Sequence, residues 1–210
     1  MQVRVVPVTP FVQNSCVVTC SETNRGAILD PGGDVATILA AVRQVGCAVD
    51  KVLVTHAHID HVGAVAEVAE LLGVPIEGPE LGDRGWIEAL PQQGRMFGLP
   101  PVRSFTPNRW LADGDRVEVG NLTFEVLHCP GHTPGHIALF SRKDRIAFVG
   151  DVLFAGSIGR TDLPGGDYAQ LLHSITTKLL PLGDDVMFYS GHGPDSTIGQ
   201  ERRTNPFLTR

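Results

Sequence analysis

Three histidines and one aspartate fall within six consecutive positions, 56–61, in the run THAHIDH. Neutral imidazole and carboxylate groups are ligands that zinc and iron(II) accept, and such a site needs no cysteine. In extended backbone, His56 and His58 point the same way and could hold one ion. Asp60 and His61 follow where the chain turns into a helix, so they would point to a neighbouring position. The run therefore predicts a metal site and leaves open whether it holds one ion or two.

Three more ligand-type residues follow later apolar segments. His132 comes after LTFEVLHCPG, Asp151 after RIAFVG and His192 after DVMFYSG, each directly behind a glycine. Functional groups of α/β proteins gather at the ends of strands, because the loops there converge. We therefore expect four strand ends to bring seven metal-competent side chains together.

The other histidines near these segments, and one cysteine, fit structural roles better. His173 lies in the middle of a predicted helix, and His128 lies in a predicted strand. His136 opens the next strand and could support either the site or the core. Cys129 is interpreted as a packing residue.

The composition excludes several classes of partner. The 210 residues include 17 basic and 23 acidic side chains, for a formal net charge of −6. No basic run exceeds two residues, so general nucleic-acid binding is not expected. No apolar stretch reaches a membrane span, and the first residues do not resemble a signal peptide. The four cysteines are too few for a disulfide framework, so we expect a cytoplasmic protein without a membrane partner.

Apolar patterns with periods of 2 and 3.6 residues predict the elements that position these side chains. A helix is expected between Asp34, as its cap, and Gly46, with further helices near 62–72, 167–180 and 197–204. The irregular segment 78–109 is predicted to be a loop or short-helix excursion, and a lid role stays open. The predicted strands are 2–8, 14–20, 26–30, 51–55, 116–120, 122–128, 136–140, 145–151 and 185–190. This order predicts a single α/β domain over 1–210, a four-layer αβ/βα sandwich of two mixed sheets with outer helices.

The ligand segments resemble a known family. THAHIDH fits the HxHxDH motif of the metallo-β-lactamase superfamily, and CPGHTPGH, VGDVLF and SGHG fit its remaining ligand segments in order. LFAGSIGRTDLPGGD (153–167) and ERRTNPFL (201–208) are similar to the glyoxalase II branch, in particular its short bacterial YcbL-type hydroxyacylglutathione hydrolases. The resemblance implies two divalent ions, with zinc favoured and iron or manganese as the other options. Its ligand sets would be His56, His58 and His132 for the first ion, Asp60, His61 and His192 for the second, and Asp151 as a bridge.

The resemblance also implies a reaction. The substrate would be S-D-lactoylglutathione or another hydroxyacylglutathione, cleaved to a hydroxy acid and glutathione. A hydroxide shared by both ions would attack the thioester carbonyl, with Asp60 orienting it and Asp151 bridging the ions. Asp30 is expected to accept an N–H from a metal-bound histidine. Arg160 is the main candidate for a glutathione carboxylate contact, against an internal salt bridge to a neighbouring aspartate.

Several alternatives remain at this point. The longer glyoxalase II enzymes carry a C-terminal helical domain that contacts glutathione, and none is expected here, so glutathione recognition must differ. The leading alternative is a persulfide dioxygenase with one iron on His56, His132 and Asp151. A lactonase or other esterase and a non-catalytic metal-binding domain are further alternatives. The complete second ligand set and GHGP at 191–194 favour the hydrolase. The acyl group and the oligomeric state stay undetermined.

Overall fold

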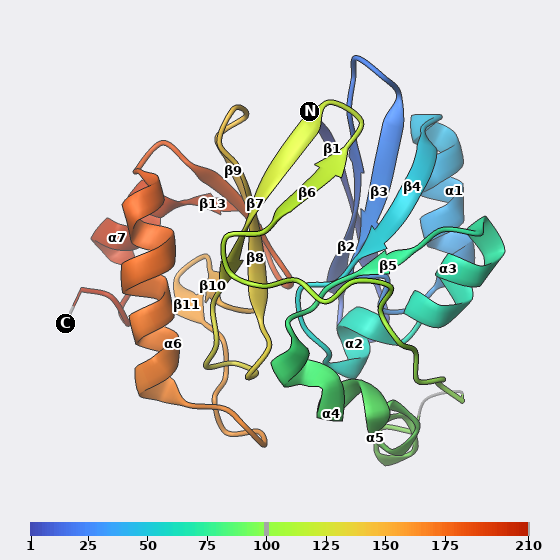
Figure 1. Cartoon of the computed structure of the whole chain (residues 1–210). Helices are drawn as coiled ribbons and strands as arrows, with labels where there is room; N and C mark the ends of the chain where they lie inside the picture. Colours follow the sequence, from blue (N-terminus) through green and yellow to red (C-terminus); the bar gives the residue numbers. More distant parts are fainter. Residues whose placement is uncertain (99–100, 210) are drawn as a thin grey trace.

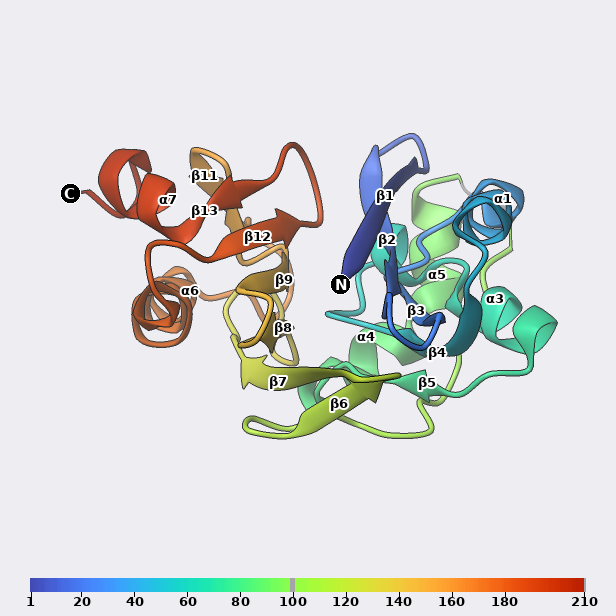
Figure 2. The same cartoon turned by 90° about the horizontal axis from the view of Figure 1, so that it is seen from above.

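The computed structural model describes residues 1–98 and 101–209. Two β sheets pack face to face, and helices cover the outer face of each, as Figure 1 and Figure 2 show. A small hairpin of β10 (Leu153–Phe154) and β11 (Ser157–Ile158) stands beside the second sheet. The four-layer αβ/βα fold expected from the sequence is therefore confirmed.

The first sheet has the strand order β1-β2-β3-β4-β5. Its first three strands pair antiparallel, and β3, β4 and β5 run parallel. Helices α1 (Val35–Val45) and α3 (Val65–Leu72) cover its outer face and bury Ile38, Val65 and Val68 in one core. The strands are β1 (Gln2–Val8), β2 (Gln13–Thr19), β3 (Arg25–Leu29), β4 (Ala48–Leu53) and β5 (Ile76–Glu77).

The second sheet has the order β13-β12-β9-β8-β7-β6, with one parallel pair, β12 and β9. Helix α6 (Tyr168–Ser174), continued as a π-helical turn, and α7 (Ile198–Thr204) cover its outer face. Leu171, Ile175 and Ile198 lie fully buried in that core. The strands are β6 (Arg116–Val119), β7 (Leu122–His128), β8 (Ile137–Ser141), β9 (Ile146–Gly150), β12 (Met187–Ser190) and β13 (Ser196–Thr197).

A third apolar core lies between the two sheets. Every second residue of β6 is buried, as the period of 2 predicts for a strand with one solvent-facing side. Val117 and Phe124 of the second sheet share this core with Leu29 and Leu53 of the first. The two sheets are thus joined by apolar packing, which fixes their strand ends relative to one another.

Two local expectations were wrong in detail. Asp34 adopts a left-handed conformation before α1 and makes no side-chain cap. Its carboxylate accepts the backbone N–H of Thr9 instead, because the β1–β2 turn lies beside it. Strand β4 ends at Leu53, so the ligand loop begins two residues earlier than predicted.

The segment 78–109 forms short helices, as expected, and also contributes to a core. It contains a 3₁₀ turn (Leu81–Asp83), α4 (Arg84–Glu88) and α5 (Leu90–Met96). Ile87 and Leu90 are buried in the core of the first sheet, so this excursion also supplies core residues that its turn-rich sequence did not indicate. Residues 99 and 100 lie outside the described residues. No helix in the described ranges is long and apolar enough to cross a membrane.

Candidate metal centre

The ligand-type side chains converge at one edge of the two sheets, where the loops after β4, β7, β9 and β12 meet. His56 and His58 follow β4, and α2 (Ile59–Val62) begins directly after them. Loops after β7, β9 and β12 carry His132, Asp151 and His192. The structure thus brings together all seven residues that the sequence motifs pointed to.

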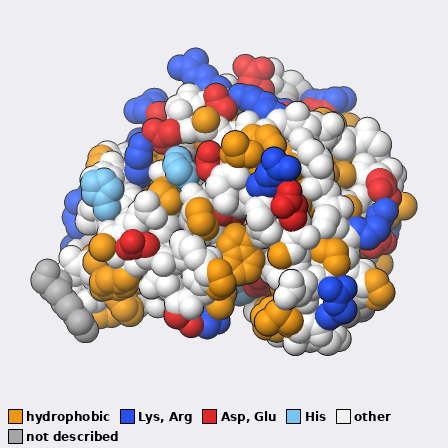
Figure 3. Space-filling view, turned by 60° about the horizontal axis from the view of Figure 1, so that its bottom comes forward, with side chains coloured by type: hydrophobic (Ala, Val, Ile, Leu, Met, Phe, Trp, Pro, Cys, Tyr) orange, Lys and Arg blue, Asp and Glu red, His pale blue; other side chains and the backbone are white. Residues whose placement is uncertain are grey.

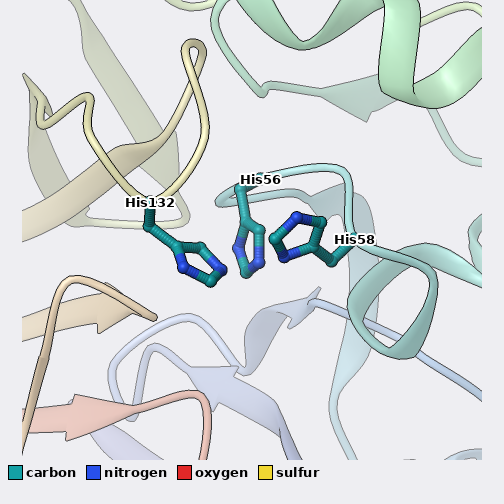
Figure 4. Close-up of side chains that lie close together, drawn as sticks. All are labelled: His56, His58 and His132. Atoms are coloured by element: carbon teal, nitrogen blue, oxygen red, sulfur yellow. The ribbon is translucent and has the colours of Figure 1, made fainter. Parts of the chain in front are cut away.

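His56, His58 and His132 form one group of candidate metal ligands, which we call the first ligand group. One ring nitrogen of each lies within 4.8 Å of the others, and Figure 4 shows the three rings facing one another. All three side chains are buried, and their Nε2 atoms have no hydrogen-bond partner within the described residues. A buried polar atom without a partner is costly. Three of them in one place therefore fit a bound cation.

Asp60, His61 and His192 form the second ligand group, again with ligand atoms within 4.8 Å of one another. Asp151 lies between the two groups. Its Oδ1 is 3.2 Å from His61 Nε2. Its Oδ2 is 3.6 Å from the Nε2 atoms of both His132 and His192. Asp151 therefore occupies the position that a bridging ligand needs.

Asp30 orients one histidine of each group. His61 Nδ1–H donates to Asp30 Oδ2 over 3.0 Å. His56 Nδ1 lies 3.1 Å from Thr55 Oγ, and that hydroxyl donates to the same carboxylate at 2.6 Å. The Thr55 backbone N–H occupies the other carboxylate oxygen at 2.7 Å. Because its oxygens are engaged, Asp30 holds the rings with Nε2 toward the site and is not itself free to bind an ion.

Backbone carbonyls orient two further rings. His132 Nδ1 donates to the carbonyl of Arg160 at 2.8 Å, and His192 Nδ1 donates to the carbonyl of Phe11 at 3.2 Å. An N–H held at Nδ1 leaves the lone pair on Nε2, which is the atom that faces the site. Four of the five ligand histidines thus have a fixed tautomer suited to metal binding.

Burial keeps the first ligand group neutral. Burial, together with the neighbouring rings, holds the pKa of His56 well below its usual range and lowers the pKa of His58 to about 3. Burial also lowers the pKa of His132, against the nearby Asp151. Neutral rings present free lone pairs, so this group is ready to take a cation.

Carboxylates reverse this effect in the second group. Burial lowers the pKa of His61, but Asp151 and Asp60 outweigh burial and raise it well above its usual range. The hydrogen bond from His192 to Asp60, 3.1 Å long, likewise raises the pKa of His192 against burial. Burial opposes ionisation of Asp151, yet His61 holds the pKa of that carboxyl far below its usual range. Without a cation, this group therefore consists of paired opposite charges.

Asp83, which was not among the residues predicted from the sequence, ties two ligand loops together. Its buried carboxylate accepts the Ala57 N–H at 2.8 Å, between the two histidines of the first loop. It also accepts the Thr133 hydroxyl at 2.9 Å and the Gly135 N–H at 2.6 Å, next to His132. Burial raises the pKa of Asp83 to about 6, against these three hydrogen bonds. Asp83 stands in the irregular segment, where no local pattern marks it.

His136 supports Asp151 from behind. Its Nε2 accepts the backbone N–H of Asp151 at 3.0 Å, and its ring stacks on His56 with centroids 4.5 Å apart. Gly150 makes this approach possible, because a Cβ there would lie 2.7 Å from the His136 ring and its φ is +48°. His136 is thus a buried partner of the site, one of the two roles considered for it.

A cleft of about 620 Å³ opens over both ligand groups. Arg160 lines this cleft, and its guanidinium also donates two hydrogen bonds of 2.7 Å to Asp162. Arg160 thus makes the internal salt bridge, and its contact with a glutathione carboxylate stays a prediction. Arg202 is bound to Asp184 at 2.8 Å and does not line the cleft.

The C-terminal motif ERRTNPFL anchors the cleft from outside. The buried Glu201 carboxylate accepts the Gly156 N–H at 2.7 Å, and Asn205 donates to the Ser157 carbonyl at 3.0 Å. These contacts fix the β10–β11 hairpin, which carries Phe154 into the cleft. The motif thus acts on the site through the hairpin.

The remaining candidates lie away from the ligand atoms. His173 is exposed on α6, and His128 at the end of β7 donates to the Pro134 carbonyl at 2.9 Å. Cys129 is buried in the core of the second sheet, where burial raises the pKa of its thiol to about 12. None of these three residues belongs to either ligand group.

Comparison with known proteins gives a family and several relatives. Residues 8–192 match the model of the metallo-beta-lactamase superfamily. The chain is 46% identical over 209 residues to hydroxyacylglutathione hydrolase GloC of Haemophilus influenzae, covering 99% of this chain and 98% of that protein. Other curated relatives bear less specific names, such as the probable metallo-hydrolase YqgX of Bacillus subtilis at 35% identity.

Three solved structures share the fold over nearly the whole chain. The BLEG-1 B3 metallo-beta-lactamase has a TM-score of 0.92 at 38% identity, covering both chains fully. The di-iron-bound form of TTHA1623 has a TM-score of 0.89 at 39% identity, covering 98% of this chain and 100% of that one. ETHE1 from Myxococcus xanthus has a TM-score of 0.82 at 27% identity, covering 98% and 84%.

Proposed function

The chain belongs to the metallo-beta-lactamase superfamily, and we propose that within it the protein is a metal-dependent hydrolase of glutathione thioesters, S-D-lactoylglutathione or a related hydroxyacylglutathione. The observation that carries the proposal is the convergence of both ligand groups, with Asp151 between them. The relative named hydroxyacylglutathione hydrolase supports the substrate class. Two divalent ions are proposed, with zinc favoured and iron or manganese accepted by the same donors.

The donor set fits this chemistry. Bound divalent cations supply Lewis-acid polarisation of a carbonyl and a lowered pKa for water. Five of the proposed ligand side chains line the cleft and so face an incoming substrate: His58, Asp60, His132, Asp151 and His192. The remaining two, His56 and His61, are fully buried beneath them.

Asp60 is proposed to orient the attacking water as well as to bind metal. Its side chain is partly exposed to the cleft and holds His192 at 3.1 Å. Asp151 and Asp60 are the only acids among the described cleft residues. A thiolate leaves without a strong acid to protonate it, so this set suffices for a thioester.

Arg160 is proposed to contact a carboxylate of the glutathione part. It is the only arginine or lysine among the described residues that line the cleft. Asp162 already holds its guanidinium, so the added attraction for a substrate carboxylate is small. The cytoplasmic location expected from the sequence stays a prediction.

The proposal is tested by measuring metal content together with two activities. The purified protein is expected to contain about two metal equivalents and to release glutathione from lactoylglutathione. The alternative, a persulfide dioxygenase with one iron on His56, His132 and Asp151, predicts oxygen consumption with glutathione persulfide. Oxygen consumption with the thioester left intact would establish that alternative and end the hydrolase proposal.

A further inference from the structure

The cleft has a polar floor and apolar sides. The floor consists of the ligand side chains, whereas the described residues of the two sides are mostly aromatic or aliphatic. Glutathione carries two carboxylates and an ammonium group. Among the described residues, the sides offer those groups one charged partner, Arg160, and the amides of Gln92 and Gln93, of which Gln93 already donates to the Trp86 carbonyl. The apolar part of the sides suits an uncharged part of a substrate.

One side is built by helices α4 and α5 together with the β1–β2 turn. We call Trp86, Met96, Phe97 and Phe11 the α5 wall. The Trp86 ring meets the His58 ring edge-on, with centroids 4.7 Å apart, so the wall begins directly at the first ligand group. Phe11 and Phe97 meet edge-on with centroids 5.7 Å apart and close its outer end.

The α5 wall is exposed to an unusual degree for such side chains. Met96 is 74% exposed, Phe97 56% and Phe11 40%, and Figure 3 shows hydrophobic side chains gathered on this lower side of the molecule. Grouped exposed apolar side chains beside a polar site mark a binding surface. Among the described cleft residues of α4 and α5, none is charged.

The opposite side of the cleft carries the polar contact. Arg160 follows β11 there, and Phe154 of β10 meets the His192 ring with centroids 6.2 Å apart. In Figure 1 this hairpin lies to the left and helices α4 and α5 lie to the right, and residues of both line the cleft. A thioester with its carbonyl over the floor would thus extend its charged thiol part toward Arg160 and its acyl part toward the α5 wall.

We propose that the α5 wall selects substrates by an apolar side chain on the acyl group, so that glutathione thioesters of larger aliphatic or aromatic 2-hydroxy acids are cleaved better than lactoylglutathione. This inference rests on the proposed function and names its substrate class. Burying one methylene against such a wall raises kcat/KM by about fourfold when the methylene is fully covered. The gain falls short of this where the wall is open to water.

The experiment compares three glutathione thioesters that differ only in the acyl side chain: lactoyl, 2-hydroxyhexanoyl and mandeloyl. For the 2-hydroxyhexanoyl and mandeloyl substrates, the metal-loaded protein is expected to show a kcat/KM about tenfold or more above that for lactoylglutathione. Equal values for all three would overturn the inference and leave the thioester hydrolase standing. If none of the three is cleaved by protein that carries two metal equivalents, the proposed function itself fails.

Two variants assign the effect to the wall. Met96→Ala and Phe97→Ala are expected to lower the ratio of kcat/KM for the 2-hydroxyhexanoyl substrate to kcat/KM for lactoylglutathione about fivefold to tenfold. Leu71→Ala is the matched control, because Leu71 is also an exposed apolar residue, 60% exposed on α3, and lies outside the cleft. An unchanged preference in both wall variants, or an equal loss in the control, would overturn the assignment.

Discussion

The two ligand groups lie on either side of Asp151 and differ in solvent exposure and in the direction of their pKa shifts. The first, His56, His58 and His132, is buried, and its rings have lowered pKa values. The second contains Asp60 and His192, which are partly exposed, and its histidines have raised pKa values. The imidazole rings of the first group are neutral, whereas the histidines of the second group form ion pairs with carboxylates.

Because of this difference, two neighbouring sites that share Asp151 are expected to differ in metal affinity. A cation entering the first group displaces no proton, because its rings are neutral. A cation entering the second group must displace the protons that the carboxylates hold on His61 and His192. We therefore expect the first group to fill at lower metal concentration and lower pH than the second.

The largest expected effect comes from removing a ligand of the first group. His56→Ala should lower kcat for thioester cleavage by about 1,000-fold or more, because a lost metal removes several kcal/mol of charge stabilisation. His173→Ala is the control, since His173 is exposed on α6. Steady-state kinetics with lactoylglutathione checks both, and similar losses in the two variants would contradict the assignment of ligands.

Asp83 offers a way to weaken the first group without touching a ligand. Asp83→Asn replaces a carboxylate that accepts three hydrogen bonds, so the loops carrying His56 and His132 lose a common anchor. Metal affinity of the tighter site should fall about 10- to 100-fold. Competition with a chromophoric chelator measures that affinity.

Asp113→Asn is the matched control for this substitution. Asp113 also accepts a backbone N–H, that of His128 at 2.9 Å, but it lies outside the cleft. Its variant should keep the metal affinity of the unmodified protein. An affinity unchanged in Asp83→Asn would show that the two loops hold their positions without the shared carboxylate.

The pH dependence of metal loading tests the expected difference in metal affinity between the two ligand groups. As pH falls, protons compete increasingly with metal for His61 and His192, whose pKa values are raised, so the metal affinity of the second group should fall by about tenfold per pH unit for each proton displaced. The first group, with His58 titrating at a pKa of about 3, should keep its metal in the same range. Metal content after dialysis at a series of pH values checks this order. Simultaneous loss of both equivalents would contradict it.

The smallest expected effect concerns Arg160. Arg160→Ala should raise KM for a glutathione thioester about twofold to fivefold with kcat unchanged. The effect is small because the guanidinium is exposed and already paired with Asp162, so its attraction for a substrate carboxylate is weak. Arg202→Ala, at an arginine bound to Asp184 outside the cleft, should leave KM unchanged. A loss in kcat with KM unchanged would contradict the proposed carboxylate contact, because Arg160→Ala keeps the backbone carbonyl that accepts the His132 hydrogen bond.

Much of the fold followed from local patterns. The period of 2 in β6 and the period of 3.6 in α1 predicted their types because each element has one buried face. The role of Asp34 failed because its partner, the Thr9 N–H, belongs to a turn 25 residues away. Ile87 and Leu90 were missed as core residues because glycine and proline around them hide a short helix.

The available chemistry can be read along the chain, because the seven ligand-type residues, the glycines before three of them and the family motifs are all local features. Every property that depends on the distance between loops arises only in the folded molecule. Folding brings Asp151 between the two ligand groups and lets the Asp83 carboxylate bind two of the ligand loops. It also lowers the pKa of His58 and raises the pKa of His61. The physical reason is that electrostatic and hydrogen-bond energies depend on burial and separation in space, which sequence spacing does not contain.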